Sequence, residues 1–114
     1  MEPEPLVCHI LLICFTEKTS EAKIAEIWSL FEDLPNGCDG IEGIISVQCG
    51  SNNSPEGLSK GFTHSVVVMF DSVAARDAYT GTSTQPAAIK HLALKDVFLP
   101  AIKDIIVLDF SPGS

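Results

Sequence analysis

The stretch from Leu6 to Phe15, LVCHILLICF, decides the fold. It is almost wholly apolar, it is rich in branched side chains, and two prolines stand before it. A short run of this kind is typical of a central β-strand that is covered on both faces. Because side chains alternate along a strand, the odd-numbered residues from His9 to Phe15 share one face and the even-numbered residues from Cys8 to Cys14 share the other. Both faces are apolar, so each needs a cover.

The next segment has the pattern of an amphipathic helix. Thr19 or Ser20 can cap it, and residues 35–37, Pro-Asn-Gly, end it. Its apolar residues recur at three- and four-residue spacing and predict one buried stripe, formed by Ile24, Ile27, Trp28, Phe31 and Leu34.

The rest of the chain predicts three more strands and two more helices. The strands are expected at residues 41–49, 62–70 and 103–110, with a polar, turn-rich loop over residues 50–61 that we expect to be mobile. Asp71-Ser72 predicts a helix start before residues 73–79, and Pro86 is suited to the first turn of another helix that runs towards Leu94.

This order, β-α-β-β-α-β, predicts an α+β, ferredoxin-like fold with a four-stranded antiparallel sheet and its helices on one face. The 114 residues fit one domain, residues 1–114, with an ordered core at about 6–110. The other sheet face is then an apolar surface of a size that soluble monomers rarely expose. We expect a second copy of the sheet to cover it, giving a homodimer; the alternative cover is the long loop or the N-terminal segment.

The composition of the chain limits which kinds of partner and which location we expect for it. Fifteen acidic and seven basic residues give a net charge of −8, which disfavours nucleic acid and anionic lipid surfaces. The chain has no apolar run long enough for a bilayer, and residues 1–5, MEPEP, lack the basic start of a secretory signal, so a cytoplasmic location is expected. Cys8, Cys14, Cys38 and Cys49 have no C-x-x-C spacing and are interpreted as reduced thiols rather than disulfide or metal ligands.

The three histidines are widely spaced, with no H-x-x-x-H motif and no carboxylate cluster, and we expect no metal. The sequence contains neither a P-loop nor a G-x-G-x-x-G motif, so we expect no cofactor of the nucleotide class.

Several motifs resemble the stress-responsive A/B barrel family over nearly the whole chain. They are His9 in V-C-H-I-L-L, Gly61-Phe-Thr-His64, Phe70-Asp-Ser-Val73 with Tyr79 nine residues after that Phe, and residues 105–110, IIVLDF. The resemblance implies a homodimer whose two sheets pack face to face as a dimeric α+β barrel, in some members within a larger assembly. One member is a polyketide cyclase, whereas most members have no assigned reaction.

Strand parity predicts that His9 and His64 face one cavity under the helices, because the first and third strands are neighbours in this fold. Tyr79 could reach its mouth. We expect apolar walls from Leu11, Ile13, Trp28, Phe31 and Val66. The resemblance implies pocket positions for His9, His64 and Tyr79; the alternative is that the two histidines are satisfied core residues and that Tyr79 anchors its helix.

The cyclase motif H-P-A-H, whose last His acts as the base, is replaced by Gln85-Pro-Ala-Ala88 if three residues are inserted. Ala88 then occupies the position of the base, whereas a gapless alignment puts Gln85 there. Neither side chain takes up a proton at neutral pH. His91 lies one helical turn after Ala88 and is a candidate to replace the base.

Two functions follow. One is a homodimer that binds a small hydrophobic ligand without the H-P-A-H base. The other is a cofactor-free cyclase or lyase acting on a polyketide-like or aromatic compound, with His64, Tyr79 and His91 as candidate catalytic residues and His9 as a further polar group.

Overall fold

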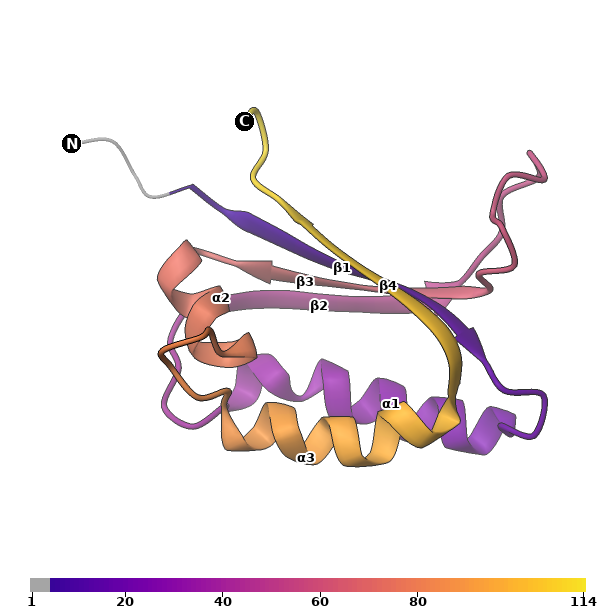
Figure 1. The fold of residues 1–114 in the computed structure, drawn as a ribbon, viewed down its shortest axis with the longest axis horizontal. Helices are drawn as coiled ribbons and strands as arrows, with labels where there is room; N and C mark the ends of the chain where they lie inside the picture. The colour runs from indigo at the N-terminus through magenta and orange to yellow at the C-terminus, as the bar shows by residue number, and fades with distance from the viewer. Residues whose placement is uncertain (1–4) are drawn as a thin grey trace.

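The structure is a computed structural model that describes residues 5–114. One antiparallel sheet has the strand order β2-β3-β1-β4, with β1 at Val7–Phe15, β2 at Ile44–Ser51, β3 at His64–Phe70 and β4 at Ile102–Phe110. Three α-helices lie on one side of it: α1 at Glu21–Glu32, α2 at Val73–Thr80 and α3 at Ile89–Phe98 (Figure 1). Short 3-10 turns follow α1 and α3, at Leu34–Asn36 and Leu99–Ala101. The predicted α+β, ferredoxin-like fold with a four-stranded antiparallel sheet is confirmed.

β1 holds the sheet together because it pairs with β3 on one side and with β4 on the other. Leu11 lies between Val66 of β3 and Val107 of β4, and its side chain is buried under the helices. The odd-numbered residues of β1 therefore face the helices, as their alternation predicts. The even-numbered residues face the opposite side.

The first two helices begin where the sequence predicts. The Ser20 side chain accepts a hydrogen bond from the Lys23 N–H, and the Ser72 side chain accepts one from the Ala75 N–H, both at 3.1 Å. These bonds satisfy backbone donors that a helix start leaves free. The stripe of α1 packs as predicted, with Ile27 and Phe31 fully buried.

The second crossover differs from the prediction. Residues 81–88 form an irregular connection, α3 begins only at Ile89, and Ala88 is its N-cap residue. Pro86 therefore lies outside the helix. The Asp39 carboxylate accepts a hydrogen bond from the Ile89 N–H, so a residue 50 positions earlier caps the helix. Ala88 itself is tied back to α2, since its N–H donates to the Tyr79 carbonyl at 3.1 Å.

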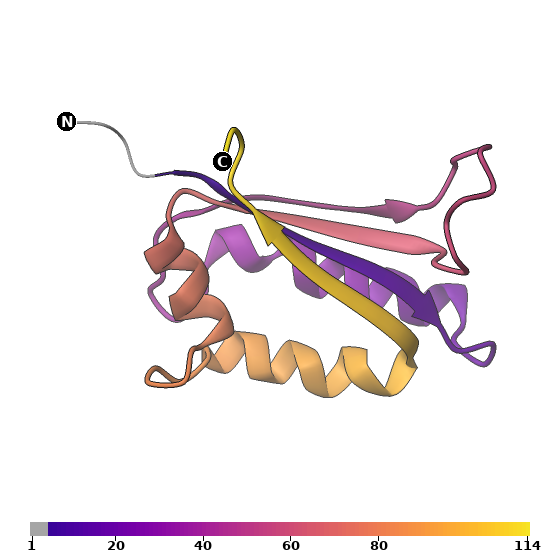
Figure 2. The same ribbon diagram turned by 45° about the horizontal axis from the view of Figure 1, so that its top comes forward.

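No helix among the described residues covers the other side of the sheet (Figure 2). The "open sheet face" is formed by Ile10 and Leu12 of β1 with Ile106, Leu108 and Phe110 of β4. The three β4 side chains remain 43%, 52% and 48% exposed. The loop between β2 and β3 approaches only one end of this face, at Leu12 and Ile106, so the loop does not provide the alternative cover. Residues 1–4 lie outside the described part.

Leu108→Asp tests whether this face joins two copies. Placing a carboxylate at the centre of an apolar contact should convert a dimer into a monomer at micromolar concentration, because the buried charge has no partner. Sedimentation velocity measures the change. Leu92→Asp is the control, since Leu92 is comparably exposed, at 48%, but lies on α3. A wild-type protein that sediments as a monomer would contradict the expectation.

Candidate ligand cavity and acid-base site

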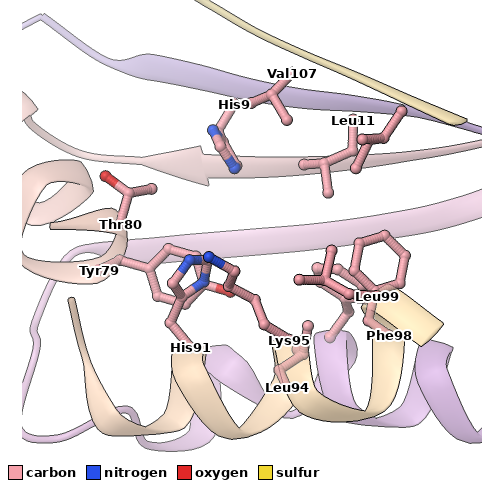
Figure 3. Close-up of a pocket in the computed structure, with 12 residues that line it drawn as sticks. His9, Leu11, Tyr79, Thr80, His91, Leu94, Lys95, Phe98, Leu99 and Val107 are labelled. Carbon is pink, nitrogen blue, oxygen red and sulfur yellow. The ribbon is translucent and has the colours of Figure 1, made fainter. Parts of the chain in front are cut away.

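A cavity of about 360 Å³ lies between the sheet and helices α2 and α3 (Figure 3). Its walls are mostly apolar and include Leu11, Phe31, Leu94, Phe98, Ile105 and Val107. Its polar residues are His9, Tyr79, Thr80, His91 and Lys95. An apolar pocket of this volume with a few polar groups is at the lower end of the size range of small-molecule sites.

The cavity opens beside β4, which is an edge strand. Val107 pairs with Leu11 and so faces the helix side of the sheet. It is nevertheless 54% exposed, whereas Leu11 is 6% exposed. The helices therefore cover β1 fully and β4 only in part, which leaves an entrance between β4 and α3.

His9 is oriented by a chain of charged groups. Its Nδ1 lies 2.7 Å from Oδ1 of Asp109, its neighbour across the β1–β4 pair. The other carboxylate oxygen of Asp109 accepts a hydrogen bond from Nη1 of Arg76 at 2.7 Å. With a carboxylate at Nδ1, that nitrogen carries the proton, so Nε2 is the nitrogen left to accept one.

Tyr79 and His91 meet at the floor of the cavity. Their ring centroids are 4.3 Å apart in an edge-to-face arrangement. Among residues 5–114, neither the Tyr79 hydroxyl nor Nδ1 of His91 has a hydrogen-bond partner, although both atoms are buried. Buried polar atoms normally find partners, so this pair stands out.

Burial also changes the ionisation of both rings. It lowers the pKa of His91 to about 4, assisted by the nearby positive charge of Lys95 and by His9. It raises the pKa of the Tyr79 hydroxyl. At neutral pH the two groups are therefore uncharged, and each can exchange hydrogen bonds with a ligand.

The cavity brings together five of the residues singled out in the sequence, namely His9, Leu11, Phe31, Tyr79 and His91. The other five, Ile13, Trp28, His64, Val66 and Ala88, do not line it.

The position of His64 shows why strand parity alone did not predict which residues line the cavity. It lies on the predicted sheet side but pairs with Ile13, whereas His9 pairs with Val68. Four residues of strand separate these positions, roughly 13 Å. The His64 ring packs instead against Phe15 and Trp28, with centroids 5.0 and 5.9 Å away. Strand parity predicted that His9 and His64 face one cavity, whereas the structure places His64 outside the cavity that His9 lines. Trp28, expected as a wall of the cavity, belongs instead to this separate aromatic cluster.

Sequence reasoning missed three charged residues of the site: Arg76, Lys95 and Asp109. Asp109 carried a usable signal, because an acidic residue interrupts the apolar strand IIVLDF. Its register against His9 became visible only with the β1–β4 pairing. Among the described residues, no three His, Cys, Asp or Glu side chains are grouped so that they could hold a metal ion.

A model of the stress-responsive A/B barrel domain matches residues 7–112. The chain belongs to this family. Within the described part, no helix of this family member is both long and apolar enough to cross a membrane.

Two curated relatives match over nearly their whole length. The stress-response A/B barrel domain-containing protein HS1 of Arabidopsis thaliana is 31% identical over 108 residues, 95% of this chain and 91% of the relative. Olivetolic acid cyclase of Cannabis sativa is 26% identical over 106 residues, 93% of this chain and 96% of the relative.

Two solved structures are also similar to this chain. A hydroxynitrile lyase from Passiflora edulis has a TM-score of 0.80 and 25% identity, covering 99% of this chain and 97% of the lyase. A dimeric ferredoxin-like protein from Thermobifida fusca, with a TM-score of 0.70 and 18% identity, covers 95% of this chain and 92% of that protein, and supports the fold alone.

The lowered pKa of His91 predicts a loss of stability in acid. The folded state favours neutral His91, whereas the unfolded chain takes up a proton near pH 6.5, so stability falls as the pH drops from about 6.5 towards 4. Relative to His91→Gln, the wild type should lose roughly 1–3 kcal/mol more between pH 7.5 and 4.5. Urea unfolding at both pH values measures this difference. An equal loss in wild type and His91→Gln would refute the assignment.

Proposed function

We propose that this family member binds a small, mostly apolar ligand that carries an oxygen function, in the cavity between the helices and the sheet. The observation that carries the proposal is the pair of buried polar atoms at the cavity floor, Tyr79 Oη and His91 Nδ1, which have no hydrogen-bond partner among residues 5–114. Leaving such atoms unpaired costs about 1–3 kcal/mol each, and a ligand oxygen between them would remove that cost. The surrounding walls would bury the apolar part of the ligand.

The proposal does not use the H-P-A-H base of the polyketide cyclase. In the alignment with a three-residue insertion, Ala88 stands at the position of the base, and Ala88 is a buried N-cap residue outside the cavity lining. In the gapless alignment the position is Gln85, which is exposed. Either way the segment supplies no titrating group to the cavity, and His91 is the histidine that reaches it from α3.

Tyr79→Phe distinguishes a ligand-binding hydroxyl from a structural one. The variant should bind 1-octanol about 2–10-fold more weakly, because one hydrogen bond to the ligand is lost. Without ligand it should be as stable as wild type or more so, because it removes a buried hydroxyl that has no partner. Isothermal titration calorimetry and urea unfolding measure the two effects. Ser29→Ala, which removes an exposed hydroxyl on α1, is the control for binding. A Tyr79→Phe variant that loses stability yet binds normally would contradict the proposal.

A second candidate is an acid-base enzyme, and the 2.7 Å hydrogen bond between His9 Nδ1 and Asp109 Oδ1 is the observation that favours it. A histidine held by a carboxylate at Nδ1 presents Nε2 as a proton acceptor, and the resulting positive charge is stabilised by that carboxylate. Asp109 and Arg76 would be positioning residues in this scheme. Tyr79 could donate a hydrogen bond to the substrate oxygen from the opposite wall.

The relation to a hydroxynitrile lyase and to olivetolic acid cyclase suggests reactions of this class. In hydroxynitrile cleavage, His9 Nε2 would take the hydroxyl proton. The oxygen forms the carbonyl as the bond from carbon to the nitrile breaks, and the departing cyanide takes the proton from His9 and leaves as hydrogen cyanide. Atoms and charge balance without a cofactor.

His9→Gln tests this second candidate. If the protein releases cyanide from mandelonitrile, the variant should do so at least about 100-fold more slowly, as expected for loss of a general base. His64→Gln is the matched control and should retain activity, because His64 lies outside the cavity. A wild-type rate equal to that of the buffer blank would exclude this reaction, and an undiminished rate in His9→Gln would exclude the role of His9.

The same proposal includes the assembly. Two copies would meet through the open sheet face as a dimeric α+β barrel, which leaves both cavities on the outer, helical layers. All four cysteines are free thiols, which fits a reducing cytoplasmic location.

A further inference from the structure

Lys95 is the one lysine that lines the cavity. It is located one turn after His91 on α3, and its side chain runs back towards His91 and Tyr79 (Figure 3). A helix-surface lysine ordinarily extends its ammonium group into water. Here the side chain lies along an apolar wall and places a positive charge beside two neutral polar groups.

Among residues 5–114, no carboxylate forms an ion pair with Lys95, and no hydrogen bond ends on its Nζ atom. The carboxylate nearest to the cavity polar groups, Asp109, already faces both His9 and Arg76. Within the described part of the chain, Lys95 is therefore a cation without an ion-pair partner, in a protein whose net charge is −8.

Three hydrogen-bond donors are available at this place. Lys95 offers its ammonium group, Tyr79 its hydroxyl, and neutral His91 can carry its proton on Nδ1, the atom that has no partner. A carboxylate has two oxygens and about four acceptor positions, so it can use all three donors. An alcohol or a ketone has a single oxygen and no charge to match Lys95.

We propose that the ligand is an apolar monocarboxylate, whose carboxylate is bound by Lys95 together with Tyr79 and His91. Its hydrocarbon part occupies the space between Leu11, Phe31, Leu94 and Phe98. The negative charge of the chain as a whole repels anions, so recognition depends on this local site and not on the general field of the protein. This assignment rests on the proposed ligand-binding function and specifies the chemical class of the ligand.

Octanoate and 1-octanol form a matched pair of probes, because they share a chain of eight carbons and differ at the head group. At pH 7.5 the wild-type protein should bind octanoate at least tenfold more tightly than 1-octanol, as measured by isothermal titration calorimetry. Lys95→Met keeps an apolar side chain of similar length and removes the charge. It should bind octanoate about tenfold more weakly and 1-octanol unchanged.

Lys103→Met is the matched control, because Lys103 is an exposed residue of β4 outside the cavity lining. It removes the same charge and should keep the preference for octanoate. If both probes bind equally to wild type, or if Lys95→Met retains the preference, the carboxylate assignment is wrong while ligand binding stands. If neither probe binds at millimolar concentration, both the assignment and the proposed function fail.

Discussion

The pairing of β1 with β4 is the constraint on which the rest of the site depends. It places Asp109 directly beside His9, so a carboxylate on an edge strand orients an imidazole on a central strand. Arg76 of α2 completes the arrangement by binding the second carboxylate oxygen. A shift of the register by one residue would turn Asp109 to the open sheet face and leave His9 buried without its partner.

The same pairing explains why a cavity exists. The buried side chains under the helices come mainly from β1 and β3, while β4 extends past the helical cover. A ferredoxin-like domain of this size has only its crossover helices to cover one sheet face, and here part of the second crossover is the irregular segment of residues 81–88. The space left beside β4 is lined by one apolar wall from the sheet and one from α3. Polar groups of the two helices converge at this space because α2 ends beside it and α3 begins beside it.

The relatives show that this architecture is compatible with different roles. One named relative is a cyclase and one structural neighbour is a lyase, while HS1 is named for its domain alone. The fold therefore does not determine the chemistry, which depends on the side chains that line the cavity. In this chain those side chains combine an oriented histidine, two neutral polar rings and a lysine that has no ion-pair partner among residues 5–114. Under the proposed function, the polar head group of a ligand binds at the floor, and His9 is the group assigned to proton transfer.

The amino-acid sequence by itself determined the element order, the caps Ser20 and Ser72, the parity of β1 and the apolar character of both sheet faces. These features depend on neighbours close in the chain, and short-range periodicity records them. His9 stood out as a polar residue in an apolar strand, whereas Tyr79 was singled out by the resemblance to the stress-responsive A/B barrel family and His91 by its spacing from Ala88.

Only the tertiary structure decided which polar groups meet. The sequence showed on which side His64 lies but not that its register places it beside Ile13, away from His9. The sequence placed Pro86 inside a helix, whereas the helix begins at Ile89. The carboxylate that caps this start belongs to Asp39, 50 residues earlier, so no local pattern records it. The partnership of His9 with Asp109 spans 100 residues. Such contacts depend on strand register and helix docking, and these are set by the packing of the whole core and not by any local pattern.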